Sequence, residues 1–160
     1  MSKELVFIRE IISKYHPKFT HSIDLKRTGI ESPEIFHVER LIEETLACVG
    51  NMQFVDAEGY DFLPDFSDSK TVSVNAKSRY AEITGVENKI GALRITVYNT
   101  FTNCADFFFV PKNDLDQIKL ACYGKNSFKE RVRFRYNEKG HYNYFEDFRV
   151  DTFEQLATIR

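Results

Sequence analysis

Apolar positions divide the chain into a helical first third and a remainder dominated by strands. Apolar side chains recur at helical spacing in residues 3–15 and again in residues 33–49. Ser32 and Pro33 are typical of the first residues of a helix, and Gly50 is typical of the residue that ends one. We therefore expect two N-terminal helices, joined by an irregular segment over residues 17–31.

After Gly50 the pattern becomes one of short, β-rich runs, of which Leu93–Tyr98 alternates most regularly. The expected strands cover residues 52–56, 58–62, 68–75, 80–85, 92–99, 105–110, 130–136 and 142–150. Two further helices are expected at residues 113–122 and 151–158. Helices followed by a run of strands and a late helix predict an α/β (α+β) fold, with a central mixed β-sheet flanked by helices.

Length and composition limit the class of protein. The 160 residues predict a single domain, 1–160, and the 42% of hydrophobic residues are enough for a core. A net charge of −2 gives no general attraction to nucleic acid. Three widely spaced cysteines, the lack of a signal-peptide pattern and the lack of an apolar run of membrane length favour a soluble protein of the reducing cytoplasm.

The segment from Tyr60 to Thr71 carries the most suggestive chemistry. Asp68 and Lys70 lie on one face of an expected strand, because side chains alternate along it. If the chain folds back at Pro64-Asp65, Asp61 comes to lie opposite Asp68, and two carboxylates so placed can share a divalent cation. The alternative is a plain turn, in which aspartate and serine serve local hydrogen bonds.

Glu39 is the second candidate. Helical spacing places it near the apolar side of the 33–49 helix, whereas Arg40 and Glu44 fall on the opposite side. A carboxylate at the edge of an apolar stripe needs a partner. Glu39 either points into the site formed by Asp61, Asp68 and Lys70, or is a rim residue paired with a lysine.

A cationic strand is the third candidate. Arg131, Arg133 and Arg135 alternate with apolar residues after Lys129, so an extended strand presents the three guanidinium groups on one face. Phosphates would satisfy such a row, and these four residues are the candidate nucleic-acid contacts. The alternative is a solvated outer face whose charges are relieved by nearby acids, namely Glu130, Glu138 or Asp147.

These residues together resemble the PD-(D/E)XK nuclease superfamily, to which many restriction endonucleases belong. The resemblance lies in an acid on an early helix (Glu39), an aspartate at a strand end (Asp61) and the tripeptide Asp68-Ser69-Lys70, within a core of residues 33–122. It implies a restriction-endonuclease-like core and a site in which Glu39, Asp61 and Asp68 hold Mg²⁺ or Mn²⁺ while Lys70 positions the attacking water. Asp65, which follows Pro64, is the literal "PD" match, so either Asp61 or Asp65 is the first metal ligand.

The resemblance implies a metal-dependent endonuclease that hydrolyses DNA, similar to type II restriction or phage-encoded enzymes. Residues 123–150 would then contact double-stranded DNA, and a homodimer would supply the second active site that a duplex cutter needs. The alternative is a non-catalytic interaction protein, related to phage or bacterial defence, that binds a protein or nucleic-acid partner through its many Phe and Tyr side chains.

Overall fold

The computed structural model of the chain describes residues 10, 14, 35–123 and 131–160. The expected helix at 3–15 lies outside this part except for Glu10 and Lys14, and so do the segment 17–31, Ser32 and Pro33. The described helices are α2 (Ile35–Gly50), α3 (Lys112–Tyr123) and α4 (Phe153–Thr158), with short 3-10 helices η2 (Val86–Asn88) and η3 (Glu146–Phe148). The strands are β1 (Gln53–Ala57), β2 (Tyr60–Leu63), β3 (Asp68–Val74), β4 (Tyr80–Thr84), β5 (Leu93–Asn99), β6 (Cys104–Val110), β7 (Arg131–Arg135) and β8 (Arg149–Val150).

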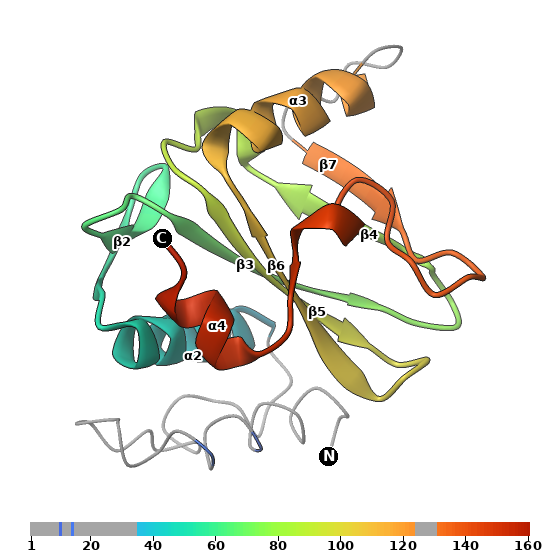
Figure 1. Cartoon of the computed structure of the whole chain (residues 1–160), viewed down its shortest axis with the longest axis horizontal. Coiled ribbons are helices and arrows are strands. Elements are labelled where there is room, and N and C mark those ends of the chain that lie inside the picture. Colours follow the sequence, from blue (N-terminus) through green and yellow to red (C-terminus); the bar gives the residue numbers. More distant parts are fainter. Residues whose placement is uncertain (1–9, 11–13, 15–34, 124–130) are drawn as a thin grey trace.

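A four-stranded mixed sheet forms the centre of the molecule, with the strand order β3-β5-β6-β8 (Figure 1). β3 runs parallel to β5, so that Asp68 lies beside Leu93 and Val74 beside Asn99. β5–β6 and β6–β8 are antiparallel pairs. Two antiparallel pairs, β1–β2 and β4–β7, stand outside this sheet.

The central sheet is covered on both faces, which explains why its middle strand β5 is buried along its whole length. Alternate residues of β6 pack into different cores, with Phe107 and Phe109 against α2 and α4, and Phe108 and Val110 on the other side. The second core includes Leu115 of α3 and the inward-facing side chains of β4 and β7. Figure 1 shows α2 and α4 side by side near one end of β3, and α3 above β7.

The strand expected at 142–150 is the main correction. Only Arg149–Val150 pairs with the sheet, and the residues before it form turns and η3. Tyr142 explains the difference, because its buried hydroxyl donates to Asp106 and accepts a hydrogen bond from Asn99 at 2.7 Å. The Tyr142 backbone N–H donates to the Glu146 carboxylate at 2.9 Å, which bends the chain into a local turn.

The other expected strands and helices of the described part are present, with ends that differ by at most a few residues. The chain is therefore a mixed α+β protein with a multi-strand mixed sheet and helices, as the order of elements predicts. A restriction-endonuclease-like core remains a prediction. Among the described helices, none combines the length and the apolar character that crossing a membrane would require.

Candidate active site

Asp61 of β2 and Asp68 of β3 lie together at the start of the central sheet. The chain reverses between them, and the backbone N–H groups of Asp61 and Phe62 both donate to the Ser67 carbonyl. The Asp61 carboxylate accepts a hydrogen bond from the backbone N–H of Ser69 at 2.9 Å. A second hydrogen bond joins the Asp61 side chain to the Asp68 side chain. The turn expected at Pro64-Asp65 thus does bring the two carboxylates together, although β2 forms its ladder with β1.

Both carboxylates are almost removed from water, since Asp61 is 6% exposed and Asp68 is 3% exposed. Burial, followed by the charge of Asp68, raises the pKa of Asp61 well above the usual range of an aspartate. Two charged carboxylates in contact repel each other, so either a cation lies beside them or one of them takes up a proton. Positive charge beside the pair relieves this repulsion.

Two lysines supply positive charge to Asp68. The ammonium group of Lys70, predicted from the sequence, lies 3.7 Å from Asp68 Oδ2. The ammonium group of Lys89 lies closer, at 2.9 Å from the same oxygen, and its side chain is only 9% exposed. Sequence spacing gives no sign of Lys89, because it reaches the site from the loop between η2 and β5.

Lys89 reaches Asp68 because its loop packs closely against the turn at Gly59 and the turn at Phe66. The Ile90 backbone N–H donates to the Gly59 carbonyl at 3.3 Å. A Cβ on Gly91 would lie 2.4 Å from the Phe66 carbonyl oxygen, so only glycine allows the loop to approach so closely. Gly59 has a φ of +88° and would meet the Asn88 carbonyl in the same way.

Glu43 is the acid of α2 whose pKa is raised by burial and by the charges of the carboxylate pair. Burial, then the charge of Asp61, raises the pKa of Glu43 to about 8, with smaller effects of Glu39 and Asp68. Glu43 lies one helical turn after Glu39, on the same side of the helix that helical spacing predicts for Glu39. The assignment of Glu39 to the site stays a prediction, and Glu43 joins it as a stronger candidate.

Asp65 has a different partner, which separates it from the pair. Arg94 is fully buried in β5, and its guanidinium group lies 2.6 Å from Asp65 Oδ2. Asp65 also accepts hydrogen bonds from the backbone and hydroxyl groups of Ser67, at 3.0 and 2.7 Å. These bonds hold the pKa of Asp65 below its usual value. Of the two candidates for a first metal ligand, Asp61 is thus the one that lies against Asp68.

The cationic strand forms as expected and finds partners on the protein. β7 pairs with β4, and Arg131 and Arg133 lie 3.2 and 4.0 Å from the Glu82 carboxylate. Arg135 forms an ion pair with Glu138, one of the acids named in the alternative. Lys129 and Glu130 lie outside the described residues.

The described residues contain no group of three or more His, Cys, Asp or Glu side chains arranged to hold a metal ion. What they offer is a pair of buried carboxylates with a third nearby. Comparisons of the chain with family models, with curated proteins and with solved structures found no match. The functional argument therefore depends on the chemistry of these residues alone.

Proposed function

We propose that the chain is a metal-dependent nuclease that hydrolyses phosphodiester bonds in DNA at the Asp61–Asp68 pair. The observation that carries this proposal is the contact between two buried carboxylates flanked by two lysines. Buried acids with raised pKa values, placed beside specific charged partners, are more common at functional sites than elsewhere. The resemblance to PD-(D/E)XK nucleases points to the same residues.

The pair suits Mg²⁺ or Mn²⁺ in its chemistry. Mg²⁺ favours oxygen ligands and is commonly held by one or two carboxylates, with water and substrate phosphate in the remaining positions. Asp61 and Asp68 would supply the two carboxylates, and Glu43 would act on bound water from α2. When bound, the cation would lower the pKa of a water molecule and polarise the phosphoryl oxygen.

The other residues of the site have roles that follow from their positions. The Ser69 N–H orients the Asp61 carboxylate through the 2.9 Å hydrogen bond. Lys70 and Lys89 are ammonium donors within 4 Å of Asp68, suited to hold a water molecule or a phosphate oxygen. Glu43 is a third carboxylate close to the pair, and burial together with the charges of Asp61 and Asp68 raises its pKa, so it is placed to accept a proton from water at the site.

Cutting both strands of a duplex would require two such sites, so the proposal includes a homodimer on double-stranded DNA. A non-catalytic interaction protein is the second candidate. It is favoured by the ion pair between Lys89 and Asp68, which already neutralises one carboxylate. In that case the acidic pair stabilises the fold and binds no metal.

Cleavage distinguishes the two candidates. Supercoiled plasmid and labelled oligonucleotides are incubated with the protein in about 5–10 mM Mg²⁺ or Mn²⁺. A parallel incubation contains EDTA in place of the metal. We expect cleavage only with metal, its loss in Asp68→Asn, and no change in Asp147→Asn, an exposed aspartate of η3. Equal cleavage by wild type and Asp68→Asn would rule out the Asp61–Asp68 pair as the site, and no cleavage with either metal would rule out the nuclease.

A further inference from the structure

The turn that joins β2 to β3, residues 64–67, determines how far apart Asp61 and Asp68 lie. Ser67 directly precedes Asp68 in the chain, and its carbonyl oxygen accepts hydrogen bonds from the backbone N–H groups of Asp61 and Phe62, at 2.9 and 3.1 Å. Ser67 is therefore tied to one carboxylate residue through the chain and to the other through hydrogen bonds. A movement of Ser67 would change the separation of the pair.

Arg94 holds this turn from the side of β5. Its side chain is fully buried, and its Nε donates a hydrogen bond to the Ser67 hydroxyl at 3.0 Å. A terminal nitrogen of Arg94 donates to Asp65 Oδ2 at 2.6 Å. Asp65 in turn accepts hydrogen bonds from the backbone N–H and the hydroxyl of Ser67. These three side chains close a ring of contacts, which we define as the Asp65–Ser67–Arg94 clamp.

The Arg94 guanidinium group is also fixed by α4. It donates to the carbonyl oxygen of Leu156, and to that of Ile159 at 2.8 Å. The Phe109 ring of β6 lies against it, with the ring centroid 4.9 Å from the guanidinium carbon. A guanidinium group held in this way cannot turn without leaving buried polar groups unpaired. The clamp therefore joins the turn rigidly to the end of α4.

The clamp acts on the acidic pair through position and not through charge. Its single cation, Arg94, is already paired with Asp65. Two carboxylates in contact repel each other, and a free turn would relax so that they separate. Charge-assisted hydrogen bonds in a buried site oppose such a movement.

We propose that the three clamp residues are positioning residues of the acidic pair, which hold the Asp61 and Asp68 carboxylates together so that they can receive one divalent cation. Side chains that orient the ligands of a metal commonly matter to its affinity nearly as much as the ligands do. Asp65 then has a positioning role in place of the ligand role that the "PD" match implies. The inference deepens the proposed nuclease and rests on it for the role of the pair, whereas the clamp itself is tested without metal.

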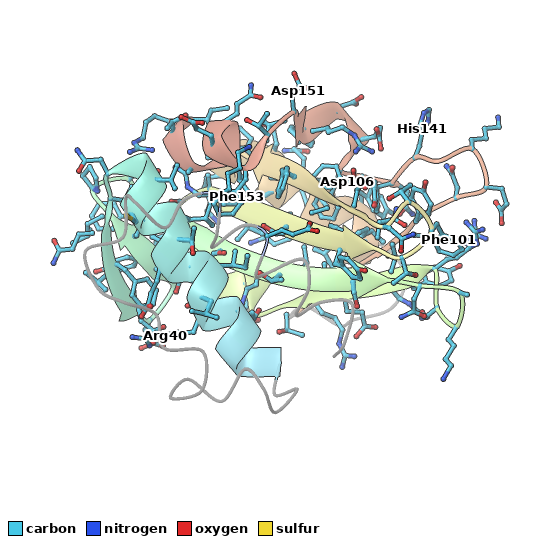
Figure 2. The ribbon with its side chains drawn as sticks, turned by 90° about the horizontal axis from the view of Figure 1, so that it is seen from below. Arg40, Phe101, Asp106, His141, Asp151 and Phe153 are labelled. Carbon is cyan, nitrogen blue, oxygen red and sulfur yellow. The ribbon has the colours of Figure 1, made fainter. Side chains whose placement is uncertain are left out.

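The ion pair between Asp106 and Arg149 provides a matched control on the same sheet. The Arg149 guanidinium group lies 2.7 Å from Asp106 Oδ1, and the Asp106 side chain is 19% exposed, close to the 21% of Asp65. Figure 2 shows Asp106 nearer to Phe101, at the far end of the sheet, than to Arg40 of α2. Asp106→Asn therefore removes an equivalent ion pair that is remote from the turn.

Two variants loosen the clamp to different degrees. Asp65→Asn removes the charged partner of Arg94. Ser67→Ala removes the hydroxyl that joins Asp65 to Arg94 but leaves their ion pair intact, so it keeps the test decisive if Asp65→Asn does not fold.

Hydrogen exchange in metal-free buffer shows whether the turn is held. The Ser69 backbone N–H, which donates to Asp61 Oδ2, is compared with the backbone N–H of Ile95 in the middle of β5 within each variant. We expect Ser69 to exchange at least about tenfold faster relative to Ile95 in both clamp variants than in wild type. The ratio should stay at the wild-type value in Asp106→Asn.

Titration calorimetry with Mn²⁺ gives the second readout. Both clamp variants should bind Mn²⁺ about tenfold or more weakly, and Asp106→Asn should remain within about twofold of wild type. A wild-type exchange ratio or a wild-type Mn²⁺ affinity in both clamp variants would overturn the inference, as would equal effects in Asp106→Asn. If the wild-type protein binds no Mn²⁺, the proposed function fails, and the exchange ratio alone decides whether the clamp holds the turn.

Discussion

At the scale of single residues, the molecule concentrates buried charge around the start of β3. Asp61, Asp68 and Lys70 could be predicted from sequence because a turn and an alternating strand suffice to bring them together. Glu43 and Lys89 could not, since the rotation of α2 against the sheet and the path of the loop after η2 depend on long-range packing. Local patterns thus predict which strand residues come together in this cluster and miss Glu43 and Lys89, which reach it from a helix and a distant loop.

The first prediction concerns Glu43. Its folded-state pKa of about 8 lies above the unfolded value, so its contribution to stability is complete below about pH 4.5 and is lost as pH rises through 8. In metal-free buffer, Glu43→Gln should therefore be more stable than wild type at pH 9, by about 1–2 kcal/mol after allowance for solvent screening.

Urea unfolding between pH 5 and pH 9 measures this effect. Glu44→Gln is the control, because Glu44 forms an ion pair with Arg40 in which the Arg40 side chain is 51% exposed. Its stability should follow that of wild type within about 0.5 kcal/mol at every pH. Parallel curves for wild type and Glu43→Gln would show that Glu43 is not held in a buried acidic cluster.

The two lysines give a second prediction at this scale. Lys89→Met should lower the free energy of unfolding by about 2–3 kcal/mol, because it leaves the buried Asp68 carboxylate without its closest cation. Lys70→Met should cost about 1 kcal/mol or less, since Lys70 is farther from Asp68 and more exposed. Adding Asp68→Asn to Lys89→Met should restore part of the loss in urea unfolding. The reverse order of the two lysines would contradict the geometry.

At the scale of elements, sequence patterns were most successful where one face of a strand or helix is buried against the sheet. The helix expected at residues 151–158, after Asp151, forms as α4, and the Thr152 hydroxyl accepts a hydrogen bond from the Gln155 N–H at 3.0 Å. The prediction of a strand over residues 142–150 was wrong for the residues before Arg149, because their aromatic side chains fill the second core from a turn. The rings that pack into this core belong to Tyr142, Phe145 and Phe148, so they recur every third residue and not at every second residue as in a strand.

Arg94 provides the prediction for this scale. Its guanidinium group joins Asp65 to the carbonyl oxygens of Leu156 and Ile159, so β5 holds both α4 and the turn that precedes β3. Arg94→Met should therefore destabilise the protein by about 3 kcal/mol or more, because buried polar groups lose their partner.

Hydrogen exchange locates this loss. The amides of α4 should exchange faster in Arg94→Met than in wild type, whereas Arg40→Met, which removes an exposed ion-pair partner of Glu44, should leave them protected. If α4 keeps its wild-type protection in Arg94→Met, Arg94 does not anchor the helix.

At the scale of the whole molecule, two regions of opposite charge share one chain. The acidic pair lies where β3 begins, and the row of arginines lies on the outer face of the β4–β7 pair, whose other face packs into the second core. The sequence predicted a mixed sheet with helices, but it could not predict that β4 pairs with β7 across the intervening β5, β6 and α3. Such pairing depends on contacts far apart in the chain, which local patterns do not encode.

The central claim is that Asp61 and Asp68 together bind a divalent cation, and a crystal soaked in Mn²⁺ tests it most directly. Anomalous scattering should reveal one Mn²⁺ about 2–2.6 Å from oxygens of both carboxylates, and Asp68→Asn crystals treated in the same way should lack it. The Lys89 ammonium group should then have moved away from Asp68 Oδ2, from which it now lies 2.9 Å. A soaked crystal without Mn²⁺ at the pair, with the Lys89–Asp68 contact intact, would contradict the account.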